Sequence, residues 1–129
     1  MREEISNWWE QAERDLKTSE NSYSANDFYA SVFWCQQALE KGIKSIIMKD
    51  KKVDMKGLSI HSLIKLAKIA KLPSEFNFFL RSISPEYYIS RYPDASEEIP
   101  YKLYSKEDTE EILNKTKEVM KWLGMKIVE

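Results

Sequence analysis

Residues 28–47 read "FYASVFWCQQALEKGIKSII" and carry the clearest structural pattern of the chain. Apolar side chains recur there at three- and four-residue steps, at Phe28, Val32, Cys35, Leu39, Ile43 and Ile46. This period predicts an α-helix from about Asp27 to Lys49. Phe33, Trp34 and Ala38 add apolar surface outside the stripe, and a helix that is apolar on several sides is buried on several sides. We therefore expect the central helix of a bundle, or a helix that also meets a second subunit.

Shorter segments with the same period flank this helix. We expect them at about Ile5–Asn21, within residues 59–73, at about Ser74–Ile83 and at about Lys106–Leu123. Gly124 is the expected C-terminal stop of the last helix. Ser84 and Pro85 are typical of a helix start, and residues 91–105 are expected to form an irregular loop. With no strand pattern, repeat or linker, the chain predicts an all-α, antiparallel up-and-down bundle of four to five helices in a single domain, residues 1–129.

Composition restricts the classes of function. The formal net charge is -1, so no global positive field attracts nucleic acid or an anionic membrane. The single cysteine, Cys35, allows no intramolecular disulfide and suits a cytoplasmic protein. One cysteine and one histidine, His61, do not make an ordinary zinc site, and we expect no metal and no cofactor. The apolar runs are too short to span a membrane, and the N-terminus does not resemble a signal peptide.

Two groups of polar residues on the expected helices are candidate ligand contacts. Gln37, Lys41 and Lys44 share one side of the central helix, because they are four and three residues apart. The alternative is that they form its ordinary solvent face. His61 precedes an apolar segment, and its alternative is a histidine at the edge of the core that caps a helix.

Aromatic residues and one arginine supply the remaining candidates. Trp8, Trp9 and Trp34 lie at helical spacing, which is more typical of core or dimer interface than of a base-stacking platform. Residues 87–96, "YYISRYPDAS", place Arg91 between Tyr88 and Tyr92 and just before a proline. A guanidinium fixed in this way can bind an anion, or it can form a salt bridge to a neighbouring carboxylate.

Several pieces of the sequence, taken in order, resemble the HEPN family. They read "WWEQAERDL", "FYASVFWCQQALEKGIKSII", "HSL", "YYISRYPDA" and "MKWL". The family name denotes a domain of higher eukaryotes and prokaryotes that was proposed to bind nucleotides. The resemblance covers nearly the whole chain, and "QQALEKGIK" and "SRYPD" match best. It implies an all-α up-and-down bundle that is usually a homodimer built around its central helices.

The resemblance also implies partners and chemistry. Small prokaryotic members often act with a minimal nucleotidyltransferase encoded nearby, and some such pairs behave as toxin and antitoxin. Many HEPN toxins are metal-independent ribonucleases with an arginine followed, after four to six residues, by a histidine that acts as general acid or base. After Arg91 the corresponding positions hold Ser96, Glu97 and Glu98. The ribonuclease motif is therefore absent, whereas a family-like set remains at Gln37, Lys41, His61, Arg91 and Tyr92.

Three hypotheses follow. The first is a homodimeric, nucleotide- or nucleic-acid-associated partner of a minimal nucleotidyltransferase that lacks ribonuclease activity. Its cationic side chains would face phosphates and Tyr88 or Tyr92 would stack on a base. The second is a metal-independent ribonuclease toxin in which His61 and Arg91 meet in space. The third is a structural dimeric adaptor.

Overall fold

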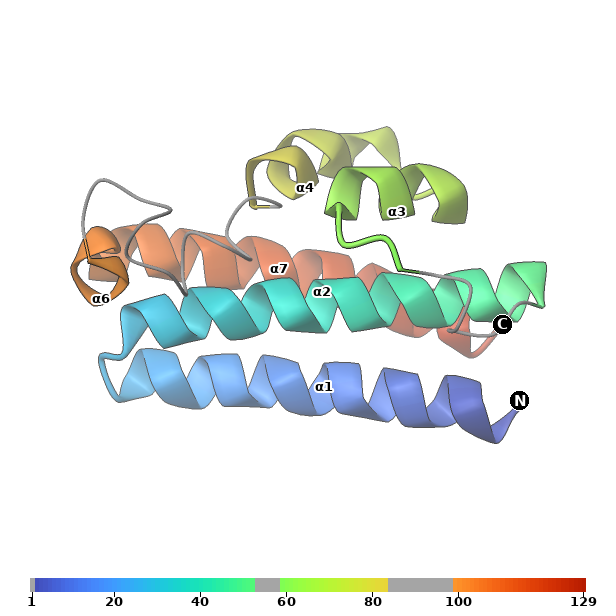
Figure 1. The fold of residues 1–129 in the computed structure, drawn as a ribbon, viewed down its shortest axis with the longest axis horizontal. Coiled ribbons are helices and arrows are strands. Elements are labelled where there is room, and N and C mark those ends of the chain that lie inside the picture. The colour runs from blue at the N-terminus through green and yellow to red at the C-terminus, as the bar shows by residue number, and fades with distance from the viewer. Residues whose placement is uncertain (1, 53–58, 84–98) are drawn as a thin grey trace.

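The computed structural model describes residues 2–52, 59–83 and 99–129, and these residues fold almost entirely into helices. Three long helices lie side by side, and two short helices form a second layer over them (Figure 1). The long helices are α1 (Glu3–Ser24), α2 (Phe28–Lys51) and α7 (Lys106–Ile127). The short elements are α3 (Leu63–Ala70), the 3-10 turn η2 (Ser74–Phe76), α4 (Asn77–Ile83) and α6 (Pro100–Leu103). The all-α bundle expected from the sequence is confirmed.

The directions of the long helices add a detail that periodicity does not give. α1 and α2 are antiparallel, since the Ser31 hydroxyl donates to the carbonyl of Ser19 at 2.8 Å. α7 runs parallel to α2, because the chain returns to the starting end of α2 before α7 begins (Figure 1). The first helix therefore enters, and the last helix leaves, at the same end of the bundle.

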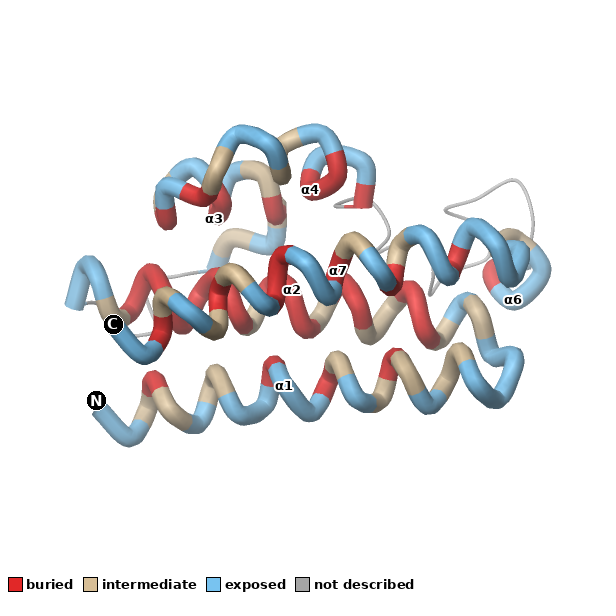
Figure 2. The backbone as a smooth tube through the Cα atoms, turned by 180° about the vertical axis from the view of Figure 1, so that it is seen from behind, coloured by how far each residue is buried: buried red, intermediate tan, exposed pale blue. Residues whose placement is uncertain are grey.

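Helix α2 is the centre of the bundle, as its apolar composition predicts. Between residues 31 and 48 every residue is buried except four half-buried ones, Phe33, Trp34, Gln37 and Lys41. Viewed from behind, buried residues line most of α2 (Figure 2). Gly42 brings its neighbours close, since a Cβ added there would lie 3.1 Å from Leu123 Cδ1 and 3.4 Å from Trp9 Cζ3. The three long helices meet at this glycine.

Helix ends follow local capping chemistry. The side-chain oxygen of Ser62 accepts from the backbone N–H of Lys65, and that of Ser105 accepts from Asp108, so two serines begin α3 and α7. Helix α3 ends at Ala70 and is capped by Lys71, which adopts a left-handed conformation with φ 59°. The expected helix at Ser74–Ile83 begins with the 3-10 turn η2.

Two expectations about helix ends were wrong. Gly124 does not stop the last helix, which continues to Ile127. The glycine instead lies against the Trp9 ring, where an added Cβ would be 3.4 Å from Cζ2. Residues 91–105 were expected to form an irregular loop, but they include α6. Pro100 is the first residue of this helix. The start expected at Ser84 and Pro85 lies outside the described residues.

Candidate functional site

A continuous line of hydrogen-bonded polar side chains runs around one side of α2, from α1 to the residues that precede α3. We call this set the polar line. Its members are Gln11, Asp15, Gln36, Gln37, Glu40, Lys41, Lys44 and His61. Two rows with four-residue spacing on α2 supply most of it, because side chains four positions apart lie above one another on a helix.

The α1 end of the polar line is built on Asp15. Its side chain is 2% exposed, and its Oδ2 accepts from Lys41 Nζ at 2.5 Å. Gln11 Nε2 donates to the other carboxylate oxygen at 2.8 Å. Lys41 also donates to Gln37 Oε1 at 3.1 Å. A buried carboxylate is tolerated only when it is paired and hydrogen-bonded, and both requirements are met.

The α3 end is built on Glu40. Its Oε1 accepts from Gln36 Nε2 at 3.1 Å, and its Oε2 accepts from Lys44 Nζ at 3.0 Å. His61 Nδ1 lies 3.2 Å from the same Oε2. The Lys44 side chain is 5% exposed, whereas that of His61 is 50% exposed. A buried carboxylate thus orients a histidine that reaches the surface.

One bond joins the two ends. Gln37 Nε2 donates to Gln36 Oε1 at 2.8 Å, so the Asp15 cluster and the Glu40 cluster form a single network. Gln36 is fully buried. These contacts exclude the solvent-face alternative for Lys44. The helix-capping part of the alternative for His61 is wrong, since Ser62 caps α3, whereas its position at the edge of the core agrees with its half-exposed side chain and its contact with Glu40.

The polar line is balanced in charge. Lys41 pairs with Asp15, and Lys44 pairs with Glu40, so the two lysines and two carboxylates sum to zero. The sequence led us to expect that both lysines face phosphates. In the structure the charge of each lysine is already neutralised by a carboxylate. What the line offers a ligand is a set of fixed donors and acceptors rather than a positive field.

Apart from the three tryptophans, the sequence proposed seven ligand contacts, and the structure brings four of them together. Gln37, Lys41, Lys44 and His61 all belong to the polar line. Tyr88, Arg91 and Tyr92 lie outside the described residues. Sequence reasoning missed Asp15, although its position in the sequence indicates a buried charge. It is a charged residue between Ala12 and Ser19 on the buried side of α1.

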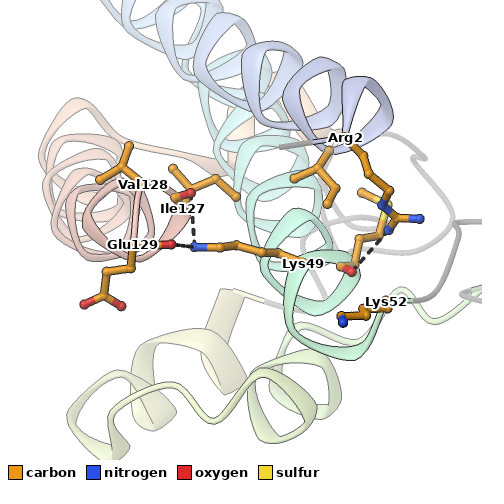
Figure 3. Close-up of a pocket in the computed structure, with 8 residues that line it drawn as sticks. Arg2, Lys49, Lys52, Ile127, Val128 and Glu129 are labelled. Carbon is orange, nitrogen blue, oxygen red and sulfur yellow. Dashed lines mark hydrogen bonds between the residues drawn. The ribbon is translucent and has the colours of Figure 1, made fainter.

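Two surface depressions bear on the site. A small pocket of about 220 Å³ opens at the α1 end of the polar line and is lined by Asn7, Trp8, Gln11 and Lys41. A larger one of about 650 Å³ lies at the end of the bundle where the chain begins and ends, lined by Arg2, Lys49 and Lys52 among others (Figure 3).

Two cations of the larger pocket, Lys49 and Arg2, donate to main-chain oxygens at helix ends. Lys49 Nζ donates to the main-chain oxygens of Ile127 and Glu129 at 3.2 and 2.6 Å (Figure 3). It also donates to the carbonyl of Lys126 at 2.7 Å. Arg2 Nη2 donates to the carbonyl of Met48 at 3.3 Å. Carbonyl oxygens at helix C-termini carry partial negative charge, and that of Met48 also accepts from the backbone N–H of Lys52 at 2.9 Å. The contacts of Lys49 and Arg2 therefore stabilise the ends of α7 and α2.

Cys35 lies on the apolar side of α2 and is fully buried. Burial raises the pKa of its thiol to about 11 and outweighs the smaller, opposite effects of the neighbouring Thr116 and Ser19 side chains. The thiol is thus protonated at neutral pH, and only the thiolate is a nucleophile or a metal ligand.

No helix in the described part of the chain is long and apolar enough to cross a membrane.

Comparison with known proteins places this bundle in a family. The HEPN domain model matches residues 5–127. The crystal structure of TT1696 from Thermus thermophilus superposes with a TM-score of 0.83 at 24% identity, covering 97% of this chain and 99% of that chain. The structure of ST0689, an archaeal HEPN homologue, gives 0.79 at 26% identity over 98% and 99%. No curated protein matches the chain.

The helical bundle and the family match agree over nearly the whole chain. The protein belongs to the HEPN family. The resemblance drawn from the sequence is confirmed.

Proposed function

We propose that this HEPN protein binds a nucleotide or a nucleic acid at the polar line and acts as the homodimeric partner of a minimal nucleotidyltransferase, in a module of the toxin–antitoxin kind, without ribonuclease activity. The observation that carries the proposal is the convergence of Gln37 and Lys41 on α2 with His61, which precedes α3, in one hydrogen-bonded network. Sites built on helices hold their donors more accurately than sites built on loops.

The electrostatics of the polar line define the mode of binding. Each lysine has a carboxylate partner, so a ligand would gain little from net charge and more from directed hydrogen bonds. Salt weakens binding in proportion to the number of phosphates that a protein neutralises. We therefore expect the dissociation constant to change only a few-fold between about 50 and 200 mM salt.

A cluster of aromatic side chains on the first half of α2 supports the homodimer. Most of α2 is already buried within one chain, which leaves Phe33 and Trp34 half-buried on its first half. Their rings are in contact, with centroids 5.0 Å apart, and Tyr29 is 38% exposed nearby on the same helix. Such an aromatic cluster is typical of an interface. Light scattering should give twice the 15.3 kDa of one chain, and a mass of 15.3 kDa would remove the dimer.

Calorimetry tests ligand binding. ATP, GTP and a short mixed-sequence RNA are titrated into wild type and His61→Ala at a protein concentration near a millimolar. Saturable heat with at least one ligand, weakened in the variant, is the expected result. Lys115→Ala is the control, because the Lys115 side chain is 43% exposed on α7 and pairs with Glu111 rather than with a member of the polar line. An absence of heat with all three ligands would remove nucleotide binding and leave the adaptor role.

One contact favours ribonuclease activity as a second candidate. Glu40 Oε2 lies 3.2 Å from His61 Nδ1, and a carboxylate that orients an imidazole is the arrangement found in general-base catalysis. Arg91, which would hold the phosphate, lies outside the described residues. This candidate predicts cleavage of mixed RNA in the presence of a metal chelator, and loss of cleavage in His61→Ala, in Arg91→Ala and partly in Glu40→Gln. If wild type leaves the RNA intact, ribonuclease activity is excluded.

A further inference from the structure

A row of exposed lysines runs along α3. Lys65 and Lys68 are three positions apart and therefore lie next to each other on the helix surface, and Lys71 follows as the C-terminal cap. All three are exposed, and none of them pairs with a carboxylate in the part of the chain that the structure describes. We call this set the lysine row.

The lysine row gives the second layer of the fold an excess of positive charge. Helix α3 carries no acidic residue, whereas α7 carries five cationic and five acidic side chains. Residues 59–83 hold four cationic side chains and one acidic one, so their net charge is +3 with His61 neutral. Helix α1, on the other side of α2, holds two cationic and six acidic side chains, a net charge of -4 (Figure 1). An excess of one sign on one side of a protein attracts ligands of the opposite sign to that side.

The lysine row begins where the polar line reaches the surface. His61 lies four positions before Lys65, and its side chain is 50% exposed while its Nδ1 lies 3.2 Å from Glu40 Oε2. The exposed parts of α3 face away from the long helices (Figure 2). A rise of about 1.5 Å per residue spaces the lysines about 4.5 Å apart along the helix, which is close enough for successive phosphates of one strand.

We propose that the lysine row binds the phosphates of a single-stranded nucleic acid that has another of its nucleotides at the polar line. The inference rests on the proposed function and names its ligand as a strand rather than a free nucleotide. The lysines of the polar line are neutralised by carboxylates, whereas those of the row are not. Phosphate contacts of exposed lysines position a nucleic acid without reading its sequence.

A single strand fits the two regions better than a duplex or an acidic protein segment. The polar line offers directed donors and acceptors, which match the edges of bases. These edges are open in a single strand and are paired in a duplex. An acidic protein segment would match the charge of the lysine row but has no base to place at the polar line.

Salt dependence separates a strand from a free nucleotide. AMP and a mixed-sequence RNA octanucleotide are titrated into wild type at about 50 and 200 mM salt. Three phosphate contacts should raise the dissociation constant of the RNA about 15- to 20-fold over this range. The dissociation constant of AMP, which reaches only the polar line, should change only a few-fold. The RNA should also bind more tightly than AMP at the lower salt concentration.

A double variant of α3 tests the row itself. Lys65→Gln combined with Lys68→Gln should weaken RNA binding about ten- to thirtyfold near 100 mM salt and should lower its salt dependence. The affinity for AMP should not change. Lys115→Gln combined with Lys121→Gln is the matched control, because it removes the same charge from exposed positions on α7. The control should change RNA affinity less than about twofold, since salt screens distant surface charges.

Four results would overturn the proposal. The lysine row is removed, and the proposed function stands, if AMP binds and the RNA binds no more tightly and with no steeper salt dependence. Equal losses in the α3 and α7 variants would show that RNA affinity follows total charge rather than the row. A glutamate octapeptide that displaces RNA as well as unlabelled RNA does would assign the row to an acidic protein. Failure of both AMP and RNA to bind removes the lysine row and the proposed nucleotide binding together.

Discussion

The polar line and the Arg2–Lys49 end of the bundle both hold cations that are partly withdrawn from water, but they pair them differently. In the polar line Lys41 and Lys44 meet carboxylate side chains. At the bundle end Lys49 meets the backbone carbonyls that terminate α7 (Figure 3). The larger cavity lies at the bundle end, yet its best-positioned cations cap helices. What a cation is bonded to is therefore a better guide to function than the size of the pocket beside it.

Removing Glu40 should have the largest effect on stability. In Glu40→Ala the buried ammonium of Lys44 loses its partner, and Gln36 and His61 lose theirs. Breaking a buried ion pair from one side costs about 3–5 kcal/mol of the free energy of unfolding, which urea denaturation measures. Glu111→Ala, which breaks the exposed pair with Lys115, should cost less than about 0.5 kcal/mol. Equal losses in the two variants would show that the polar line is not a buried network.

The buried thiol of Cys35, on the apolar side of α2, should make the stability of the fold depend on pH. Burial raises the pKa of the folded thiol from 9.0 to about 11, so the folded state holds its proton more tightly than the unfolded chain. This contribution to stability is complete below about pH 9 and is lost as the pH rises through 11. The unfolding free energy of wild type, measured relative to that of Cys35→Ala, should therefore fall by about 3 kcal/mol across that interval. A difference that stays constant across the same interval would show that the thiol is not desolvated.

Lys49→Met tests the bundle end. The variant keeps most of the apolar stem and removes the donor to three carbonyls at the end of α7, so we expect a loss of about 1–2 kcal/mol in unfolding free energy. Nucleotide affinity should not change, because the cation caps a helix. A clear loss of affinity with unchanged stability would reverse the assignment of the two regions.

Replacing both partners of one pair separates stability from binding. Asp15→Leu combined with Lys41→Met removes both charges from the α1 end, and apolar replacement of a buried pair is often neutral within about 1 kcal/mol. Each single change should cost more than the double change, because it leaves one charge without its partner. The double variant should fold normally and lose nucleotide binding. Retained binding would place the ligand away from Lys41.

The sequence predicted the bundle well because the apolar period of α2 depends only on local geometry. Val32, Leu39 and Ile43 repeat on one stripe, and all three are fully buried. The sequence could not predict that α2 and α7 run parallel, since their relative direction depends on the path of the intervening chain. Gly124 was misread because a helix-ending glycine and a glycine packed under a tryptophan look alike in sequence.

The candidate site was predicted in part. Spacing on α2 placed Gln37 and Lys41 on one side, where they are hydrogen-bonded. It could not show that Lys41 meets Asp15, twenty-six positions earlier, because the rotation of α1 against α2 decides which side chains face each other. The same limit hid the contact between Glu40 and His61. The best sequence signal for such contacts is a charged residue on a buried helix face, as at Asp15.

The single histidine gives the most direct test of ligand binding at the polar line. His61 produces one set of imidazole NMR signals that needs no assignment against other histidines. Its ring is half-exposed and held by Glu40, so a ligand at the line should shift these signals saturably as nucleotide or RNA is added. We expect the same dissociation constant from His61 as from calorimetry. Imidazole signals that stay unchanged to millimolar ligand, while calorimetry reports binding, would place the ligand elsewhere on the protein and contradict the account.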